Sequence, residues 1–267
     1  MKLRPIAGIV LRQFYLLRGS PVRLFPMVTW VGIDIVLWGF LTRYLNAVSG
    51  SGMDFVPTLL GGVLLWDFCT RIMQGVTTAF LEDVWARNFL NLFASPLSIS
   101  EYITGLVITT VATSCIGLVV MLLLAKGIFH LELFSLGLPL LAFLMVLFVF
   151  GISLGIFASA LVLRFGPASE WLMWPLPALL SPFVAVFYPL SVLPHWMQWV
   201  SLALPPSYVF EGMRTLLAGR SFPGFTLLAG SLVALLELLL SAYFYGRIYR
   251  HAVRTGLLAR YSAESVA

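Results

Sequence analysis

The sequence predicts an all-α integral membrane protein with six transmembrane helices, and three observations support that class. The chain of 267 residues is 60% hydrophobic and only 10% charged, whereas soluble domains carry about 25% charged residues. Its apolar stretches are continuous and reach the length of about 20 residues that a helix needs to cross a bilayer. They do not alternate between polar and apolar residues, as the strands of a membrane β-barrel do.

Each predicted span is an apolar stretch with few or no charged residues. The six are residues 24–41, 55–81, 103–125, 133–163, 171–194 and 222–246. An even number of spans places both termini on the same side of the membrane. Lys and Arg residues concentrate before the first span and after the last one, and cytoplasmic segments are rich in these bases. Both termini are therefore predicted to be cytoplasmic.

Residues 1–23 are predicted to form an amphipathic helix in the cytoplasmic interface of the membrane. Apolar residues recur in this segment at helical spacing: Ile6, Ile9, Val10, Phe14 and Leu17. The bases fall largely on the other side of the helix: Lys2, Arg4, Arg12 and Arg18. The alternative is that this segment extends the first span.

Several kinds of chemistry are not expected in this chain. Neither Lys2 nor Lys126 follows a glycine, so the chain lacks the Gly-Lys that ends a nucleotide-binding P-loop. The three histidines are widely spaced, and Cys69 and Cys115 form no C-x-x-C pair, so no metal site or disulfide scaffold is predicted. We interpret the basic residues as determinants of topology that face anionic lipid headgroups, and we expect no nucleic-acid partner.

The stretch GISLG, from Gly151 to Gly155, matches two patterns. As G-x-S-x-G it would be the nucleophile elbow of a hydrolase, which places Ser153 on a turn between a strand and a helix. As GxxxG, which Ser159 continues at the same spacing, it lets two membrane helices approach closely. Because the stretch lies inside a long uncharged span, we favour helix packing over an intramembrane serine enzyme.

Four charged residues fall within predicted spans: Asp34, Asp67, Arg71 and Glu237. Asp67 and Arg71 are four residues apart, which lets them pair on one helix. The three acids each lie at a depth of roughly 15 to 18 Å, near the middle of the bilayer. The four residues form either a structural network that holds helices together or a polar lining for a substrate or ion path, and both interpretations stay open.

Two segments carry a resemblance to a known family. EDVWARNFLNLFASPLSISEYITG, residues 82–105, has a short amphipathic helix followed by SPLS, and FYPLSVLPHWMQWVSLALPPSYVFEGMR, residues 187–214, is rich in proline and aromatic residues. With the basic N-terminal helix and six spans, they make the chain resemble the membrane subunits of type-2 ATP-binding-cassette exporters over most of its length. The first segment lacks the Glu-Gly pair that many members carry before the Leu.

The resemblance implies a single permease domain over residues 1–267 in a bacterial inner membrane. Two copies would form a dimer and recruit separate ATPase subunits. Those subunits would hold ATP and Mg, whereas this chain would bind no cofactor and catalyse no reaction. The cargo would be a drug-like amphiphile, a lipid or a lipid-linked glycan. The alternative is an ion-coupled secondary transporter or channel that uses the intramembrane acids.

The resemblance also implies functional residues. The loop 82–97 would contain a coupling helix, residues 84–93, whose contacts to the ATPase would be Trp85, Arg87, Asn88, Phe89, Leu90 and Phe93. The alternative is a helix that rests on lipid. The second and fifth spans would line the translocation path with Asp67, Arg71, Gln74, Trp174, Phe183, Phe187 and Tyr188.

Residues 195–219 are expected to form a re-entrant helical hairpin in the outer leaflet, between the fifth and sixth spans. Its helices would be residues 195–204 and 207–218, separated by two prolines. Glu211 and Arg214, three residues apart, would pair and hold the hairpin closed. The alternative is an ordinary extracellular loop, but Trp196, Trp199, Leu202 and Leu204 are poorly suited to contact with water.

Overall fold

The computed structural model describes residues 3–20, 25–49, 56–86, 88, 91–92, 95–131 and 133–256. These residues contain helices and no strand, so the predicted all-α class is confirmed. The α-helices are α1 (Leu3–Gly19), α2 (Phe25–Ser49), α3 (Gly61–Trp85), α5 (Ile99–Phe129), α6 (Leu138–Phe165), α7 (Leu176–Leu180), α8 (His195–Leu202), α9 (Pro205–Leu217) and α10 (Gly224–Arg254). Shorter helical segments are η2 (Val56–Leu60), η3 (Leu133–Leu136), η4 (Pro167–Leu172) and η5 (Leu190–Val192).

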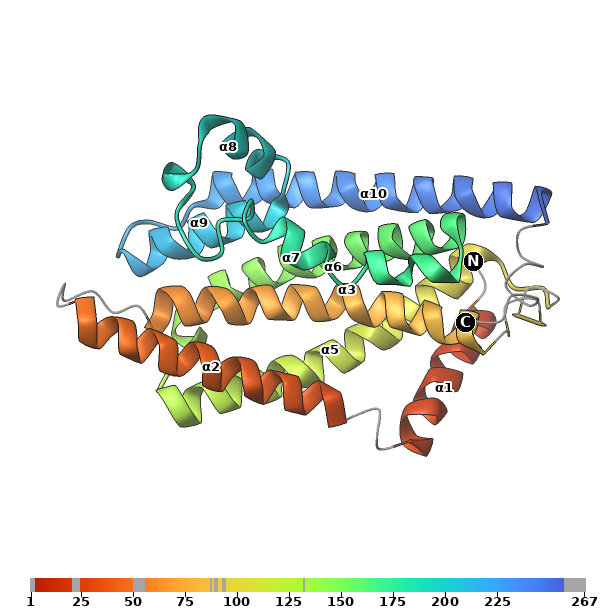
Figure 1. The fold of residues 1–267 in the computed structure, drawn as a ribbon, viewed down its shortest axis with the longest axis horizontal. Helices are drawn as coiled ribbons and strands as arrows, with labels where there is room; N and C mark the ends of the chain where they lie inside the picture. The colour runs from red at the N-terminus through yellow and green to blue at the C-terminus, as the bar shows by residue number, and fades with distance from the viewer. Residues whose placement is uncertain are drawn as a thin grey trace.

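The long helices form a bundle in which α3 and α6 are central (Figure 1). α10 packs on α6, and α5 packs on α3, with α2 against α5. α1 contacts α5 at the end of the bundle where α10 also ends. α9 fills the space beside α6 and α10 at the opposite end. The long axis of the bundle therefore runs along its longest helices.

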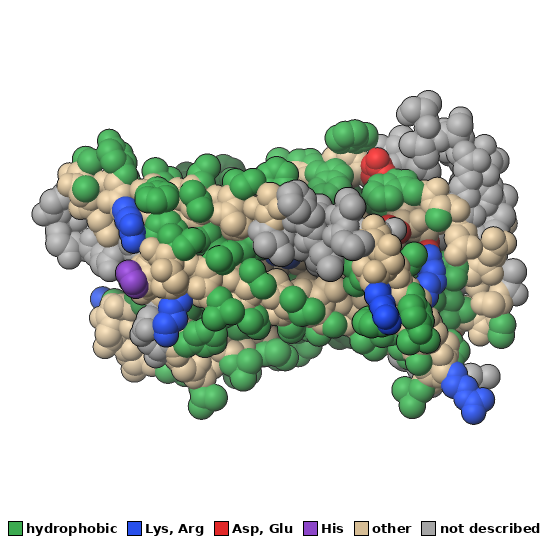
Figure 2. Space-filling model, turned by 90° about the horizontal axis from the view of Figure 1, so that it is seen from below, with side chains coloured by type: hydrophobic (Ala, Val, Ile, Leu, Met, Phe, Trp, Pro, Cys, Tyr) green, Lys and Arg blue, Asp and Glu red, His purple; other side chains and the backbone are tan. Residues whose placement is uncertain are grey.

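Within the described residues, four helices are long and apolar enough to cross a membrane: Thr29–Val48 within α2, and the whole of α5, α6 and α10. They correspond to the first, third, fourth and sixth predicted spans. The second predicted span, residues 55–81, overlaps α3, which continues to Trp85 and carries four charged side chains among its 25 residues. On the face in Figure 2, the middle of the molecule is mostly hydrophobic and the visible charges gather toward the two ends.

The prediction of a single helix over residues 171–194 is wrong. This part of the chain contains the end of η4, the five-residue helix α7, a run of turns and η5. Pro175, Pro177, Pro182 and Pro189 lack the backbone N–H that a helix interior needs. Ala185 has a φ of 59°, which a right-handed helix does not allow. Proline interrupts a helix without adding charge. The absence of charge in this stretch therefore did not reveal the interruptions.

The predicted close packing at GISLG is confirmed. A Cβ atom on Gly151 would lie 2.8 Å from the carbonyl oxygen of Cys69, and one on Gly155 would lie 2.9 Å from that of Met73. α6 thus meets the backbone of α3 directly, as small residues permit. Ser153 is buried in the middle of α6 and shares a hydrogen bond of 3.0 Å with Ser241 of α10. It does not lie on the strand-to-helix turn that a nucleophile elbow requires.

α1 is a separate helix that ends at Gly19, and it lies at a steep angle to α2 (Figure 1). The alternative that it extends the first span is therefore wrong. Ile6, Ile9 and Gln13 form its buried side. Ile9 packs where Gly105 of α5 has no side chain, because a Cβ there would lie 2.7 Å from the Ile9 side chain. Phe14, by contrast, is exposed.

Candidate functional site

α3 has two sides of different character. One side is apolar and buried, and it packs on α6 and α5. On the remaining side, half-buried polar residues recur every three or four positions, so they share one face of the helix. These residues are Asp67, Arg71, Gln74, Thr78 and Glu82. We call them the α3 polar stripe.

The stripe begins at a charged cluster between α3 and α2. Arg71 donates from Nε to Oδ2 of Asp67 at 2.6 Å. The Oδ2 atom of Asp34 on α2 lies 3.9 Å from Nη2 of the same arginine. Arg71 and Asp67 are 18% and 17% exposed, whereas Asp34 is 39% exposed. One guanidinium therefore joins two carboxylates from different helices, with Asp34 at the open edge.

An aromatic contact joins the same part of α2 to the broken fifth segment. Trp38, one turn after Asp34, stacks on Phe187 with ring centroids 5.3 Å apart and planes 19° apart. Phe187 is 37% exposed. The structure thus brings three predicted path residues, Asp67, Arg71 and Phe187, around one stretch of α2.

The other predicted path residues lie along the fifth segment. Phe183 contacts Trp196 of α8 edge to face, with centroids 6.2 Å apart. Tyr188 donates from its hydroxyl to the carbonyl of Pro182 at 2.7 Å, which closes the turn. Trp174 lies in the turn between η4 and α7 and is exposed. These side chains lie on the same segment as Phe187, but they do not gather in one compact pocket.

Glu237 is separate from the charged cluster. It lies on α10, whose main neighbours are α6 and α9. Its Oε2 atom is buried and has no hydrogen-bond partner within the described part of the chain. The structure therefore joins three of the four residues of the predicted network. A common depth in the membrane does not determine the direction in which each helix turns a side chain.

Glu211 and Arg214 form an ion pair of 3.2 Å on α9. Glu211 also accepts a hydrogen bond from the backbone N–H of Leu190 at 2.8 Å. Arg214 donates to the carbonyls of Ala185 and Val186. The pair thus attaches α9 to the turns of the fifth segment, where helix interruption leaves backbone groups without helical partners.

A second charged centre, which the sequence analysis did not single out, joins three helices at the other end of the bundle. Arg12 of α1 forms an ion pair with Asp83 of α3, and that hydrogen bond raises the pKa of Arg12. Tyr102 of α5 donates to Oδ2 of Asp83 at 2.7 Å. Both Asp83 and Tyr102 are fully buried. In the sequence, Asp83 follows Phe80 by three residues and so lies on the apolar face of α3, where an unpaired acid is not tolerated. This position could have predicted a buried partner for Asp83.

The amino-acid sequence matches a known family of membrane proteins. The family model described as ABC-2 type transporter matches residues 9–218. The chain belongs to this family. It is therefore the membrane permease of an ABC transporter rather than its ATPase, and permeases of this family work with ATP-binding subunits. No curated protein matches the sequence.

The permease does not have a separate helix beginning at residue 84. α3 continues through Trp85, and Val84 is buried in it because it follows Phe80 and Leu81 on the apolar face. Trp85 is 42% exposed and donates from Nε1 to Oε2 of Glu170 at 2.7 Å.

Asn88 continues the permease chain, with its N–H bonded to the carbonyl of Asp83 at 3.1 Å. Leu92 N–H in turn bonds to the carbonyl of Asn88 at 3.0 Å, as in an α-helical turn. Arg87, Phe89, Leu90 and Phe93 lie outside the described residues. Of the predicted contact residues, the structure thus describes Trp85, which is exposed at the end of α3, and Asn88, which is half-buried and accepts a hydrogen bond from Nδ2 of Asn91 at 3.3 Å.

Proposed function

We propose that this permease is the transmembrane subunit of an ATP-driven exporter in a bacterial inner membrane. Two copies form a homodimer and bind separate ATPase subunits, which carry ATP and Mg. The dimer moves an amphipathic cargo, such as a drug-like molecule, a lipid or a lipid-linked glycan, out of the cytoplasm or the inner leaflet. Membership of the ABC-2 family disfavours the ion-coupled alternative.

The α3 polar stripe is the observation that carries the proposal. Charged and amide side chains that face hydrocarbon are costly, and in membrane proteins they face a bundle interior or a water-filled cavity. Asp67, Arg71 and Gln74 are half-buried in the single chain, and α3 packs on the membrane-length helices α5 and α6 with its other side. A second copy packed beside the stripe would enclose it and create a path between protomers.

The distribution of bases supports the orientation. The end of the bundle with α1 and the last turns of α10 holds Arg4, Arg12, Arg18, Arg164, Arg247, Arg250 and Arg254. The opposite end holds Arg43, Lys126 and Arg220. Because the basic side of a membrane protein is cytoplasmic, α1, the loop 82–97 and both ends of the chain are assigned to the cytoplasm.

In this orientation α3 transmits the action of the ATPase. Its 25 residues form one rod of roughly 38 Å. Trp85 at its cytoplasmic end and Asp67 in the stripe are separated by roughly 27 Å of continuous helix. A push on the loop 82–97 when the ATPase subunits close would therefore displace the stripe against Asp34 and Trp38 of α2.

The broken fifth segment and the α8–α9 pair form the outer side of the path. Irregular backbone at membrane depth needs protein or water to cover it, and Arg214 provides donors for two of its carbonyls. The exposed Trp196 and Trp199 of α8 suit the membrane interface. We therefore assign residues 195–219 to a re-entrant hairpin in the outer leaflet.

A disulfide experiment tests the dimer directly. Gln74→Cys is made in a chain that also carries Cys115→Ser, because Cys115 is exposed and Cys69 is buried. Mild oxidation in membranes should give a covalent dimer. The matched control is Leu123→Cys on the exposed face of α5, which should remain monomeric. A Gln74→Cys chain that stays monomeric while the control forms dimers would contradict a path between protomers at the stripe.

A further inference from the structure

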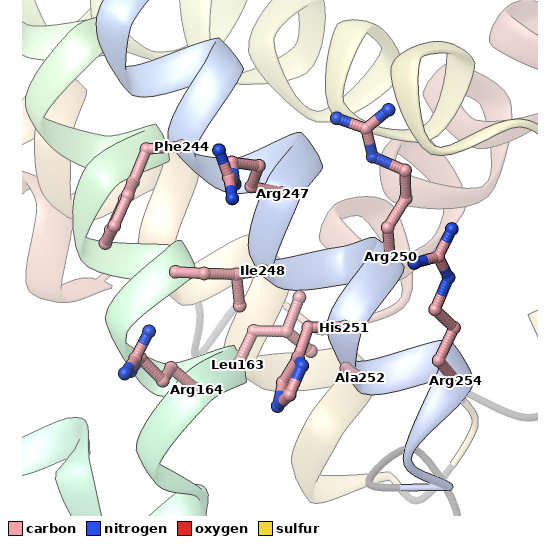
Figure 3. A pocket seen from close by; sticks show the side chains of 9 residues that line it. All are labelled: Leu163, Arg164, Phe244, Arg247, Ile248, Arg250, His251, Ala252 and Arg254. Carbon is pink, nitrogen blue, oxygen red and sulfur yellow. The ribbon is translucent and has the colours of Figure 1, made fainter.

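A basic pocket lies between the cytoplasmic ends of α6 and α10. Its cavity has a volume of about 520 Å³. α6 contributes Arg164, and α10 contributes Arg247, Arg250, His251 and Arg254 (Figure 3). Most of its lining residues lie beyond residue 218, where the match to the family model ends, and none of them belongs to the proposed translocation path.

The charge of this pocket is not compensated within the described part of the chain. No Asp or Glu lines it, and the ion pairs between described residues involve Arg12, Arg71 and Arg214 instead. Arg247 contacts the hydroxyl of Tyr243 at 3.1 Å, and Arg250 contacts the carbonyl of Gly246 at 3.2 Å. These neutral partners orient the guanidinium groups without cancelling their charge, so the pocket attracts an anion.

The pocket has an apolar floor and an apolar exit. Leu163 and Ile248 are buried beneath the bases. Phe244 lines the side nearest the membrane centre and stacks on Phe157 of α6, with centroids 5.5 Å apart. One turn further, Leu240 is 56% exposed on α10. A ligand with an anionic group and an attached hydrocarbon chain matches this sequence of basic and apolar surfaces.

The direction of the side chains identifies the inner part of the pocket. Figure 3 shows Arg247 and His251 on the side of α10 that faces α6, Arg164 on α6 itself, and Arg250 and Arg254 on the other flank of α10. Two guanidinium groups from different helices can hold a phosphate with several charge-assisted hydrogen bonds. A basic pocket between membrane helices on the cytoplasmic side is a known setting for lipid phosphates.

We propose that this pocket binds the phosphate headgroup of an anionic phospholipid from the cytoplasmic leaflet. Arg164 and Arg247 hold the phosphate, with His251 beside it, and an acyl chain runs along Phe244 and Leu240. The pocket joins α6 to α10 across their ends, so an occupied pocket links the central helix of the permease to its last helix. The site is independent of the ATPase and of the dimer proposed above.

Lipid association with the purified chain tests this proposal. The chain is reconstituted in phosphatidylcholine vesicles that contain either spin-labelled phosphatidylglycerol or spin-labelled phosphatidylcholine, and the immobilised fraction of each is measured. We expect a clear preference for phosphatidylglycerol. Arg164→Gln with Arg247→Gln should reduce it by roughly fivefold for each base removed. Arg164→Lys with Arg247→Lys should retain most of it.

The matched control removes two bases from the same end of the molecule but outside the pocket. Arg4→Gln with Arg18→Gln removes two exposed bases of α1 that lie outside the pocket, and it should reduce the preference much less than the pocket variant does. An equal loss in the control and pocket variants would overturn the proposal, because it would show only a general surface charge. An unchanged preference in the pocket variant would overturn it as well.

A second arm separates a lipid from a soluble phosphate. Inorganic phosphate is added to the vesicles and compared with chloride at the same ionic strength. If the pocket binds lipid, the immobilised fraction of labelled phosphatidylglycerol should be the same in the two salts. Specific displacement of the labelled phosphatidylglycerol by inorganic phosphate would instead identify a site for a soluble phosphate anion and overturn the assignment to lipid.

Discussion

Arg12 of α1 and Asp83 of α3 form an ion pair although 71 positions separate them in the sequence. The carboxylate is fully buried, and Tyr102 of α5 donates to its second oxygen. This relationship joins the interfacial helix to the end of α3 that leads into the loop 82–97. A force on the loop is therefore shared by three helices rather than absorbed by a flexible end.

Replacement of Asp83 by Asn should destabilise the permease. The amide can still accept a hydrogen bond from Tyr102, but it leaves the guanidinium of Arg12 without a counter-charge. Hydrogen bonds to charged groups contribute about 1.5–3 kcal/mol, and we expect a loss of about 2 kcal/mol in the free energy of unfolding. Denaturant unfolding in detergent measures the change. Tyr102→Phe, which removes a single hydrogen bond, is the milder control, and equal stability of Asp83→Asn and the unmodified chain would contradict this role.

Trp85→Ala with Phe89→Ala should release the ATPase subunits. Trp85 is exposed at the end of α3 that leads into the loop 82–97, and Phe89 belongs to the proposed coupling segment of that loop. Co-purification of the ATPase with the tagged permease measures the contact. The control is Trp196→Ala with Trp199→Ala, which removes two exposed aromatics from α8. Retention of the ATPase by the Trp85 and Phe89 variant, at the level of the control, would remove the coupling helix from this loop.

Gln74→Leu should distinguish a path lining from a structural network. No hydrogen bond of the Gln74 side chain is found among the described residues, so its loss should change stability by less than about 0.5 kcal/mol. ATP-dependent transport should nevertheless change severalfold, because the side chain faces the proposed path. Transport and unfolding are measured on the same preparation. An unchanged transport rate across several cargoes would favour a purely structural stripe.

Arg71→Met should have a different signature from Gln74→Leu. It leaves Asp34 and Asp67 without the cation that joins α2 to α3. We expect a loss of stability together with transport, and Asp67→Asn in the same chain should restore part of the stability. Denaturant unfolding of the single and double variants measures this coupling. A double variant less stable than Arg71→Met alone would contradict the pairing.

Gly151→Ala should destabilise the contact between α3 and α6. The new methyl group would lie 2.8 Å from the carbonyl oxygen of Cys69, and overpacking of this kind costs about 1–3 kcal/mol. Gly117→Ala on α5 is the matched control, because no atom lies within 4 Å of its Cβ position. The control should be neutral or slightly stabilising, since alanine reduces the entropy of the unfolded chain. Equal effects of the two substitutions would show that α6 can move away from α3.

Local spacing predicted much of the fold. The helical periodicity of α1, the small residues at Gly151 and Gly155, and the pair Glu211–Arg214 depend on positions within a few residues of one another, and the structure contains all three. The prediction of a single helix failed for the fifth segment, residues 171–194. Hydropathy measures transfer into lipid and does not register the N–H groups that its prolines lack.

The features that the sequence did not reveal depend on distant residues. Asp83 and Arg12 meet, and Arg164 and Arg247 line one pocket, only because whole helices pack together. Glu237 shares its expected depth with Asp34 and Asp67, but the rotation of α10 about its own axis directs it elsewhere. Depth follows from counting residues along a span, whereas the facing direction follows from packing that no local pattern encodes.

Transport by the purified permease, with and without an ATPase, tests the central claim most directly. The chain is reconstituted in proteoliposomes alone under a proton or sodium gradient, and then with its ATP-binding subunits and Mg-ATP. The account predicts that cargo crosses the membrane only when the ATPase hydrolyses ATP. Transport by the chain alone under an ion gradient, at a rate that ATP and the ATPase do not raise, would contradict it.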